Sequence, residues 1–93
     1  AKLAPFDIVY IDGGHSYDVV KSDLINYAHL TSNFLVIDDC CNDIPMPHGY
    51  FTGIPSVTKA LQDFDKSKFE LQYNVVHNKV FKKKWTLNPK NLY

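Results

Sequence analysis

The fold is decided by the stretch Phe6-Asp-Ile-Val-Tyr-Ile-Asp-Gly-Gly-His-Ser-Tyr17, in which an apolar run stops at an acid and turns through two glycines into a histidine. An apolar run of this length is typical of a parallel strand whose two faces are both covered by helices. Asp12 then falls at the carboxyl end of the strand, where open α/β sheets bind their ligands. The stretch therefore predicts a strand whose carboxyl end contributes to a ligand-binding site.

The same design returns in Phe34-Leu-Val-Ile-Asp38-Asp39, an apolar strand that ends in two acids. Between the two strands, residues 17–29 have the apolar spacing of an amphipathic helix, and Ser16 suits its N-cap. Thr31-Ser32-Asn33 is a turn-prone link. A strand, a helix and a strand in succession form a βαβ unit with two parallel strands. Asp12, His15 and the two later acids are therefore expected at one crevice.

The second half of the chain predicts a further helix and a hairpin. Pro55 suits the first turn of a helix, and it follows a loop of the length that binding loops often have. Residues 69–77 alternate between apolar and polar side chains, and His77-Asn78 can form a tight turn into a last strand over residues 79–87. We expect an α/β fold, the C-terminal half of a doubly wound, mostly parallel sheet closed by an antiparallel hairpin.

Composition narrows the class of protein. The 93 residues make at most one domain with a marginal core, and their formal net charge is zero. No charge pattern favours nucleic acid, no apolar run approaches the ~20 residues of a membrane span, and no signal peptide is evident. Cys40 and Cys41 are adjacent, which is poor disulfide geometry. We interpret them as free thiols of a cytoplasmic protein.

The two strand ends closely resemble those of Rossmann-like (class I) S-adenosylmethionine-dependent methyltransferases. Within that class they look most like the metal-dependent O-methyltransferases that act on sugars and other natural-product hydroxyls. Gly53-Ile-Pro-Ser-Val57 and Ala60 resemble the start of the family's next helix. The resemblance covers residues 5 to about 86 but only the C-terminal half of the family's domain. It implies that the last strand inserts between its predecessor and the parallel pair, and that residues 1–93 are a partial domain without the Gly-rich cofactor-binding half.

The resemblance also implies a site. Asp12, Asp38 and Asp39 would bind a divalent cation, with Mg²⁺ expected, and carboxylates crowded in one crevice independently favour a hard cation. Such an ion would hold two substrate oxygens and lower the pKa of a hydroxyl group. His15 is the candidate base for the hydroxyl proton, with Asp12 as a second catalytic candidate. Candidate contacts to S-adenosylmethionine are Asp12, Gly13 and Tyr17, and the other partner would be a small-molecule hydroxyl acceptor.

Each of these residues also has a structural interpretation. Asp12 can cap a helix, and His15 can serve only as a hydrogen-bond partner for a carboxylate. Because successive side chains of a strand point to opposite sides, only one of Asp38 and Asp39 need contact the metal directly. Gly13 can serve a tight turn alone. Tyr17 can pack or line the pocket.

Two other functions remain open. Asp12-Gly-Gly-His15 superficially resembles the Asp-x-x-His of metal-dependent hydrolases, which need further histidines; the remaining ones, His29, His48 and His77, fall in a helix, a loop and a hairpin. A degenerate or truncated module without catalysis is the other alternative. An unpaired flank on strand 6–11 would expose backbone groups and apolar side chains, so the chain is a possible homo-oligomer.

Overall fold

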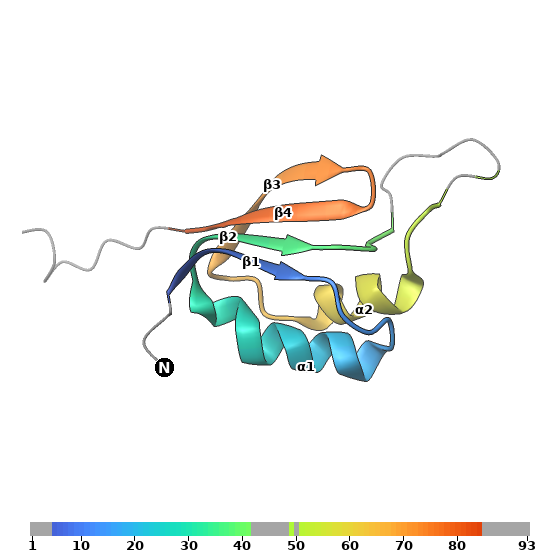
Figure 1. The fold of residues 1–93 in the computed structure, drawn as a ribbon, viewed down its shortest axis with the longest axis horizontal. Coiled ribbons are helices and arrows are strands. Elements are labelled where there is room, and N and C mark those ends of the chain that lie inside the picture. Colours follow the sequence, from blue (N-terminus) through green and yellow to red (C-terminus); the bar gives the residue numbers. More distant parts are fainter. Residues whose placement is uncertain (1–4, 42–48, 50, 85–93) are drawn as a thin grey trace, which may run out of the picture.

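The computed structural model describes residues 5–41, 49 and 51–84, which form a four-stranded mixed sheet with two α-helices (Figure 1). The elements in chain order are β1 (Phe6–Ile11), α1 (Tyr17–Tyr27), the short 3₁₀ helix η1 (Ala28–Leu30), β2 (Thr31–Ile37), α2 (Pro55–Asp63), β3 (Phe69–Val75) and β4 (Asn78–Lys83).

The strand order is β1-β2-β4-β3, with β1 and β2 parallel and β4 antiparallel to both of its neighbours. This confirms the expected hairpin, with β4 beside the parallel pair and β3 at the edge. A lysine is tolerated in the interior strand because Lys82 Nζ donates to Asn33 Oδ1 at 3.1 Å and lies over the Phe34 ring. The strand ends at Lys83, so β4 leaves the sheet before the lysine run is complete.

Both α-helices cover the same face of the sheet (Figure 1). The Ser16 hydroxyl caps α1 by accepting from the Val19 N–H, and Pro55 occupies the first turn of α2. The core between helices and sheet contains Val20 and Leu24 of α1, Leu35 and Ile37 of β2, Val57, Ala60 and Leu61 of α2, and Phe81 of β4. On the other face no described element covers the sheet, and Ile8 and Tyr10 of β1 are 58% and 53% exposed.

Two boundaries in the first half differ from expectation. The α-helix ends at Tyr27, and its last turn tightens into the 3₁₀ helix. The segment Thr31-Ser32-Asn33, expected to be a link, is the start of β2. The reason is that the buried Thr31 hydroxyl lies within hydrogen-bonding distance of the Phe6 and Asp7 carbonyl oxygens, at 3.1 and 3.2 Å, which ties these residues to β1.

The hairpin also differs in detail. The turn is Val76-His77 rather than His77-Asn78; Val76 takes the left-handed conformation (φ 57°) and Asn78 begins β4. The simple alternation expected for β3 is wrong, because the register shifts between Leu71 and Tyr73 and both side chains are exposed. Most of the expected binding loop (residues 42–48 and 50) and the end of the expected last strand (residues 85–87) lie outside the described residues.

Two features of the described residues concern the environment of the protein: the state of the cysteines and the character of the helices. Cys40 and Cys41 are both free thiols, as expected, and Cys40 is buried. Burial raises the pKa of the Cys40 thiol to about 11. Among the described residues, no helix combines the length and the apolar character that crossing a membrane requires.

Two neighbouring residues of α1 should contribute very differently to the free energy of unfolding. Leu24 is fully buried and Ile25 is 59% exposed. We expect Leu24→Ala to lower the free energy of unfolding by about 2–5 kcal/mol, because it removes buried methyl groups and leaves a cavity. Ile25→Ala, the matched control, should change it by less than about 0.5 kcal/mol. Urea denaturation followed by circular dichroism measures both; equal losses would contradict the assignment of the inner helix face.

Candidate functional site at the strand ends and the hairpin tip

The site begins where β1 and β2 end side by side. Ile11 pairs with Ile37 in parallel register, and the Asp38 N–H donates to the Ile11 carbonyl oxygen at 3.1 Å. Asp12 and Asp38 therefore leave the sheet as neighbours, and their carboxyl groups share a hydrogen bond. Two carboxyl groups this close make it harder for Asp12 to ionise.

This crowding perturbs two groups. The hydrogen bond to Asp38 raises the pKa of Asp12, with desolvation and the charges of Asp38 and Asp39 adding to the effect while His15 opposes it. The pKa of the Tyr10 phenol is also raised, first by desolvation and then by the charges of Asp38 and Asp12. The end of the parallel pair is thus a pocket of negative potential, which favours binding of protons or cations.

Asp39 connects this acidic pair to the loop after β1. Its backbone is left-handed (φ 63°), and its N–H donates to Asp38 Oδ1 at 2.9 Å. Its Oδ2 lies 2.7 Å from His15 Nε2, and the His15 side chain is 55% exposed. The bend at Asp39 therefore places the second acid against the histidine that follows the two glycines.

A close backbone crossing holds this bend in place. The Ile54 N–H donates to the Asp39 carbonyl oxygen at 2.8 Å. Gly53 has φ 96°, and a Cβ atom at this position would lie 2.1 Å from the Cys40 carbonyl oxygen. Only glycine fits here, so the Gly53 resemblance noted in the sequence has a structural reason: the segment before α2 passes directly over the acidic turn.

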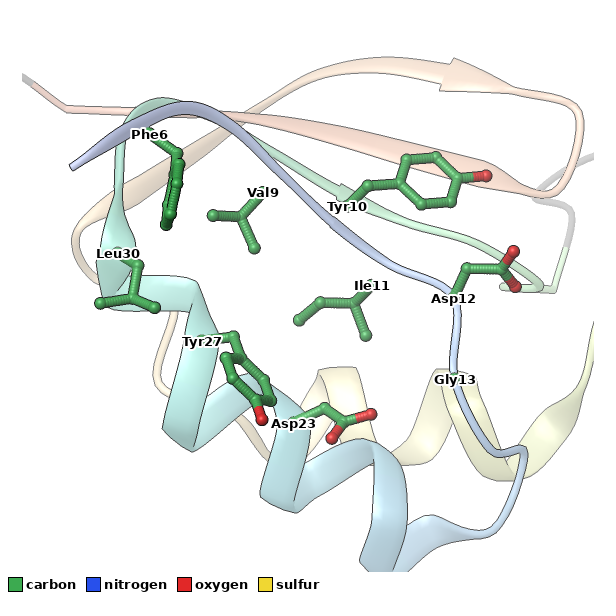
Figure 2. A pocket seen from close by; sticks show the side chains of 9 residues that line it. All are labelled: Phe6, Val9, Tyr10, Ile11, Asp12, Gly13, Asp23, Tyr27 and Leu30. Atoms are coloured by element: carbon green, nitrogen blue, oxygen red, sulfur yellow. The ribbon is translucent and has the colours of Figure 1, made fainter. Parts of the chain in front are cut away.

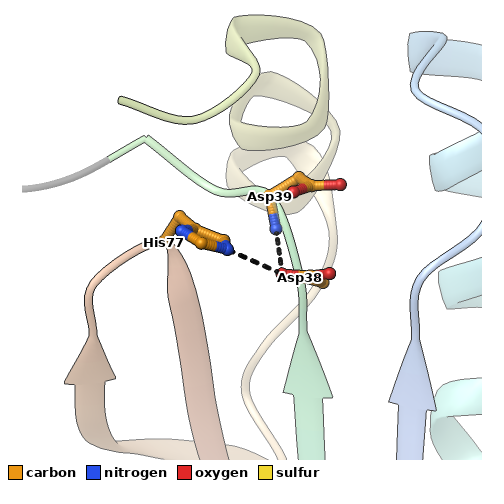
Figure 3. A group of neighbouring side chains, drawn as sticks. All are labelled: Asp38, Asp39 and His77. Carbon is orange, nitrogen blue, oxygen red and sulfur yellow. Dashed lines mark hydrogen bonds and ion pairs between the residues drawn. The ribbon is translucent and has the colours of Figure 1, made fainter. Parts of the chain in front are cut away.

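His77 reaches the site from the hairpin tip (Figure 3). Its Nε2 lies 3.4 Å from Asp38 Oδ1, and its carbonyl oxygen accepts from the Cys40 N–H at 2.8 Å. The Phe51 ring meets the imidazole edge-on, with centroids 4.9 Å apart. One ligand atom each from Asp38, Asp39 and His77 lies within 4.8 Å of the others, close enough to share a metal ion. From the sequence, His77 was expected only in a turn, and its contact with Asp38 was not predicted.

The remaining candidates lie around this group. Asp12 and Gly13 line a cavity of about 350 Å³ that runs beside the outer edge of β1 and over α1, with apolar walls and Asp23 at the same end (Figure 2). The Tyr17 hydroxyl donates to Asp63 on α2 at 2.6 Å, so it helps join the two helices. His29 is exposed on η1, and His48 lies outside the described residues.

Comparisons of the chain with protein-family models, with curated proteins and with solved structures find no match. The function must therefore be inferred from the chemistry of the strand ends themselves.

The shared hydrogen bond makes the titration of Asp12 a direct test of the site. We expect Asp12 to titrate above the usual aspartate value near 3.8, and Asp38→Asn to bring its pKa back down, because the neighbouring carboxyl group and its charge are removed. Since the pKa is raised in the folded state, the associated stability is present below about pH 3.8 and is lost as the pH rises through the folded pKa. Side-chain carboxyl ¹³C shifts followed by NMR report this; an unchanged Asp12 titration in the variant would contradict the contact.

Proposed function

We propose that this chain forms the metal- and acceptor-binding half of an S-adenosylmethionine-dependent methyltransferase that methylates a hydroxyl oxygen of a small molecule or sugar. The observation that carries the proposal is the convergence of Asp12, His15, Asp38 and Asp39 at the carboxyl ends of two neighbouring parallel strands. In the wider fold, we place the sheet as the C-terminal half of a doubly wound one. Support comes from the open edge of β1 and from the sheet face that the described helices leave uncovered.

The proposed metal role fits the chemistry of the donor set. The Asp12 and Asp38 carboxyl groups share a hydrogen bond, and Asp39 adds a third carboxylate, so a divalent cation would relieve the repulsion that raises the pKa of Asp12. Asp12, Asp38 and Asp39 would hold the ion. When bound, it supplies Lewis acidity that lowers the pKa of a substrate hydroxyl group.

His15 would accept the hydroxyl proton. When Nε2–H donates to Asp39 Oδ2, the neutral imidazole keeps a free lone pair on Nδ1. The side chain is more than half exposed, so this nitrogen is open to a substrate. Asp39 fixes the tautomer and stabilises the imidazolium that forms, as the carboxylate does in other acid–histidine pairs. His15 would thus be the catalytic residue, with Asp39 positioning it.

The cofactor would be shared with residues outside these 93. The chain contains no Gly-rich strand–turn–helix unit of the kind that grips the methionine end of S-adenosylmethionine. Asp12 and Gly13 line the cavity at the open edge of β1, so the cofactor would approach from that side and present its electrophilic methyl group. In this assignment Tyr17 acts indirectly, through its hydrogen bond to Asp63.

One observation favours a second enzymatic function. His77 joins Asp38 and Asp39, and mixed carboxylate and imidazole ligands also occur in metal-dependent hydrolases. A methyltransferase and a hydrolase form different products, so a single set of assays distinguishes the two functions.

The test compares the 93-residue chain with a fusion that adds, at its N-terminus, the cofactor-binding half of a class I methyltransferase. We expect the chain alone to bind a divalent cation without measurable turnover, because it lacks the Gly-rich half. The fusion should bind S-adenosylmethionine by isothermal titration and transfer labelled methyl groups to a hydroxyl acceptor. In the fusion, Asp38→Asn should cut the rate far more than it lowers the melting temperature, because losing one of several like charges relieves repulsion in the metal-free fold.

Asp7→Asn is the matched control, since Asp7 lies at the opposite end of the same strand and is exposed. It should leave both rate and stability close to those of the parent. Robust methyl transfer by the 93 residues alone would contradict the division between the halves. Hydrolysis of an ester or phosphate substrate by the metal-loaded chain would favour the hydrolase, and failure to bind either metal or cofactor would leave a module without catalysis.

A further inference from the structure

We propose that His77 is a metal ligand, so that the site is a mixed nitrogen and oxygen centre selective for a first-row transition metal ion over Mg²⁺. This inference rests on the divalent-cation role proposed above and goes beyond it. The resemblance in the sequence implied only carboxylate ligands. The imidazole comes from the β3–β4 hairpin, and it changes which ion the site prefers.

The distances suit ligands of one ion. His77 Nε2 and Asp38 Oδ1 are 3.4 Å apart, which is longer than a good hydrogen bond between charged groups. Two ligands bound at about 2.0–2.2 Å to the same tetrahedral or octahedral ion are separated by roughly 3.0–3.5 Å. The third donor, from Asp39, lies within the same 4.8 Å. The His77–Asp38 pair thus already has the spacing of two ligands of one ion, and Asp39 lies near enough to complete the set with a small side-chain movement.

The surroundings of His77 hold its ring in place. Its carbonyl oxygen accepts from the Cys40 N–H, so the hairpin tip is tied to the residue that follows Asp39. Phe51 packs edge-on against the imidazole. The left-handed residue Val76 directs the chain into this position, although valine rarely takes that conformation. A ring fixed by backbone and aromatic contacts loses little freedom when it binds an ion.

Two buried polar atoms at the hairpin tip fit the same role. An imidazole that binds metal through Nε2 is neutral and carries its proton on Nδ1, which then needs an acceptor. Among the described residues, His77 Nδ1 and Asn78 Oδ1 are both buried side-chain atoms without a hydrogen-bond partner, and they belong to adjacent residues. The two atoms do not bond each other in the metal-free structure, and Asn78 Oδ1 would be the acceptor for the Nδ1 proton once Nε2 binds the metal.

A contact with His15 orients the Asp39 carboxylate, as the contacts described above orient His77. Its Oδ2 is occupied by His15 at 2.7 Å, which leaves Oδ1 for the ion. His15 would thus act on the centre through Asp39, and His77 would contact the ion directly. This division predicts different effects for two histidines that lie at the same site.

The donor chemistry decides the choice of ion. Mg²⁺ prefers an all-oxygen environment that retains several waters, whereas imidazole suits Zn²⁺ and the other late transition ions, such as Ni²⁺ and Cu²⁺. With an imidazole added to the carboxylates, we expect Zn²⁺ to bind at least about tenfold more tightly than Mg²⁺. Removing His77 should lower the affinity for Zn²⁺ by at least about tenfold and change that for Mg²⁺ little.

The experiment uses the 93-residue chain loaded with Mn²⁺, and pulsed electron paramagnetic resonance detects any nitrogen bonded to the ion. Chains with ¹⁴N- and ¹⁵N-labelled histidine should differ in the nitrogen modulation. That modulation should persist in H15A, H29A and H48A and disappear in H77A and H77Q. Isothermal titration with MgCl₂, MnCl₂ and ZnCl₂ measures the affinities of the same variants, and circular dichroism checks that each is folded.

The outcomes separate this inference from the proposed function. Absence of a histidine nitrogen signal in the wild-type chain overturns the inference even if the H77 variants fail to fold. Equal losses of Mg²⁺ and Zn²⁺ affinity in folded H77A also overturn it. Mg²⁺ binding through the carboxylates alone would leave the methyltransferase proposal standing without His77. A histidine signal without methyl transfer by the fusion would keep the metal centre and remove the proposed function.

Discussion

The parallel pairing of β1 with β2 is the constraint on which the rest of the structure depends. It brings two strand ends that are far apart in sequence to the same edge, with Ile11 beside Ile37. The pairing is fixed by burial, because Ile37 is fully inaccessible and Ile11 nearly so, and a one-residue slip would turn these side chains toward the uncovered face. Asp12 and Asp38 become neighbours as a consequence of this hydrophobic register.

This register crowds several carboxyl groups together, and the surrounding elements contact each of them differently. Asp12 and Asp38 share a hydrogen bond, Asp39 turns away through a left-handed bend to meet His15, and His77 approaches Asp38 from the hairpin. Each contact neutralises or orients one carboxyl group. A cluster held together at the cost of charge repulsion is typical of functional sites, where perturbed pKa values concentrate.

Much of this arrangement follows from the sequence. The apolar runs that end at Asp12 and Asp38 predict both strands and their parallel relation, and the alternating residues after Phe69 predict the hairpin. Boundaries were less predictable: the buried hydroxyl of Thr31 made a turn-prone segment into strand, because tertiary hydrogen bonds override local propensity. Val76, rather than an asparagine, has the left-handed conformation, and the conformational preferences of single residues do not predict this.

His77 shows where sequence reasoning could have gone further. An antiparallel strand beside β2 must start at the carboxyl end of β2, so the turn before it lies at the same edge as Asp38. The expected topology therefore already contained the contact, although the distance and the ring orientation depend on the Cys40 and Phe51 contacts that only the folded chain provides.

The most direct test of the central claim, that one ion site forms where β1, β2 and the hairpin tip meet, is paramagnetic broadening of amide NMR signals by substoichiometric Mn²⁺. We expect the signals of Asp12, Asp39 and His77 to broaden first, while those of His29 and Lys68, at the opposite end of the fold, stay sharp. Uniform broadening, or broadening centred on the far end, would contradict it.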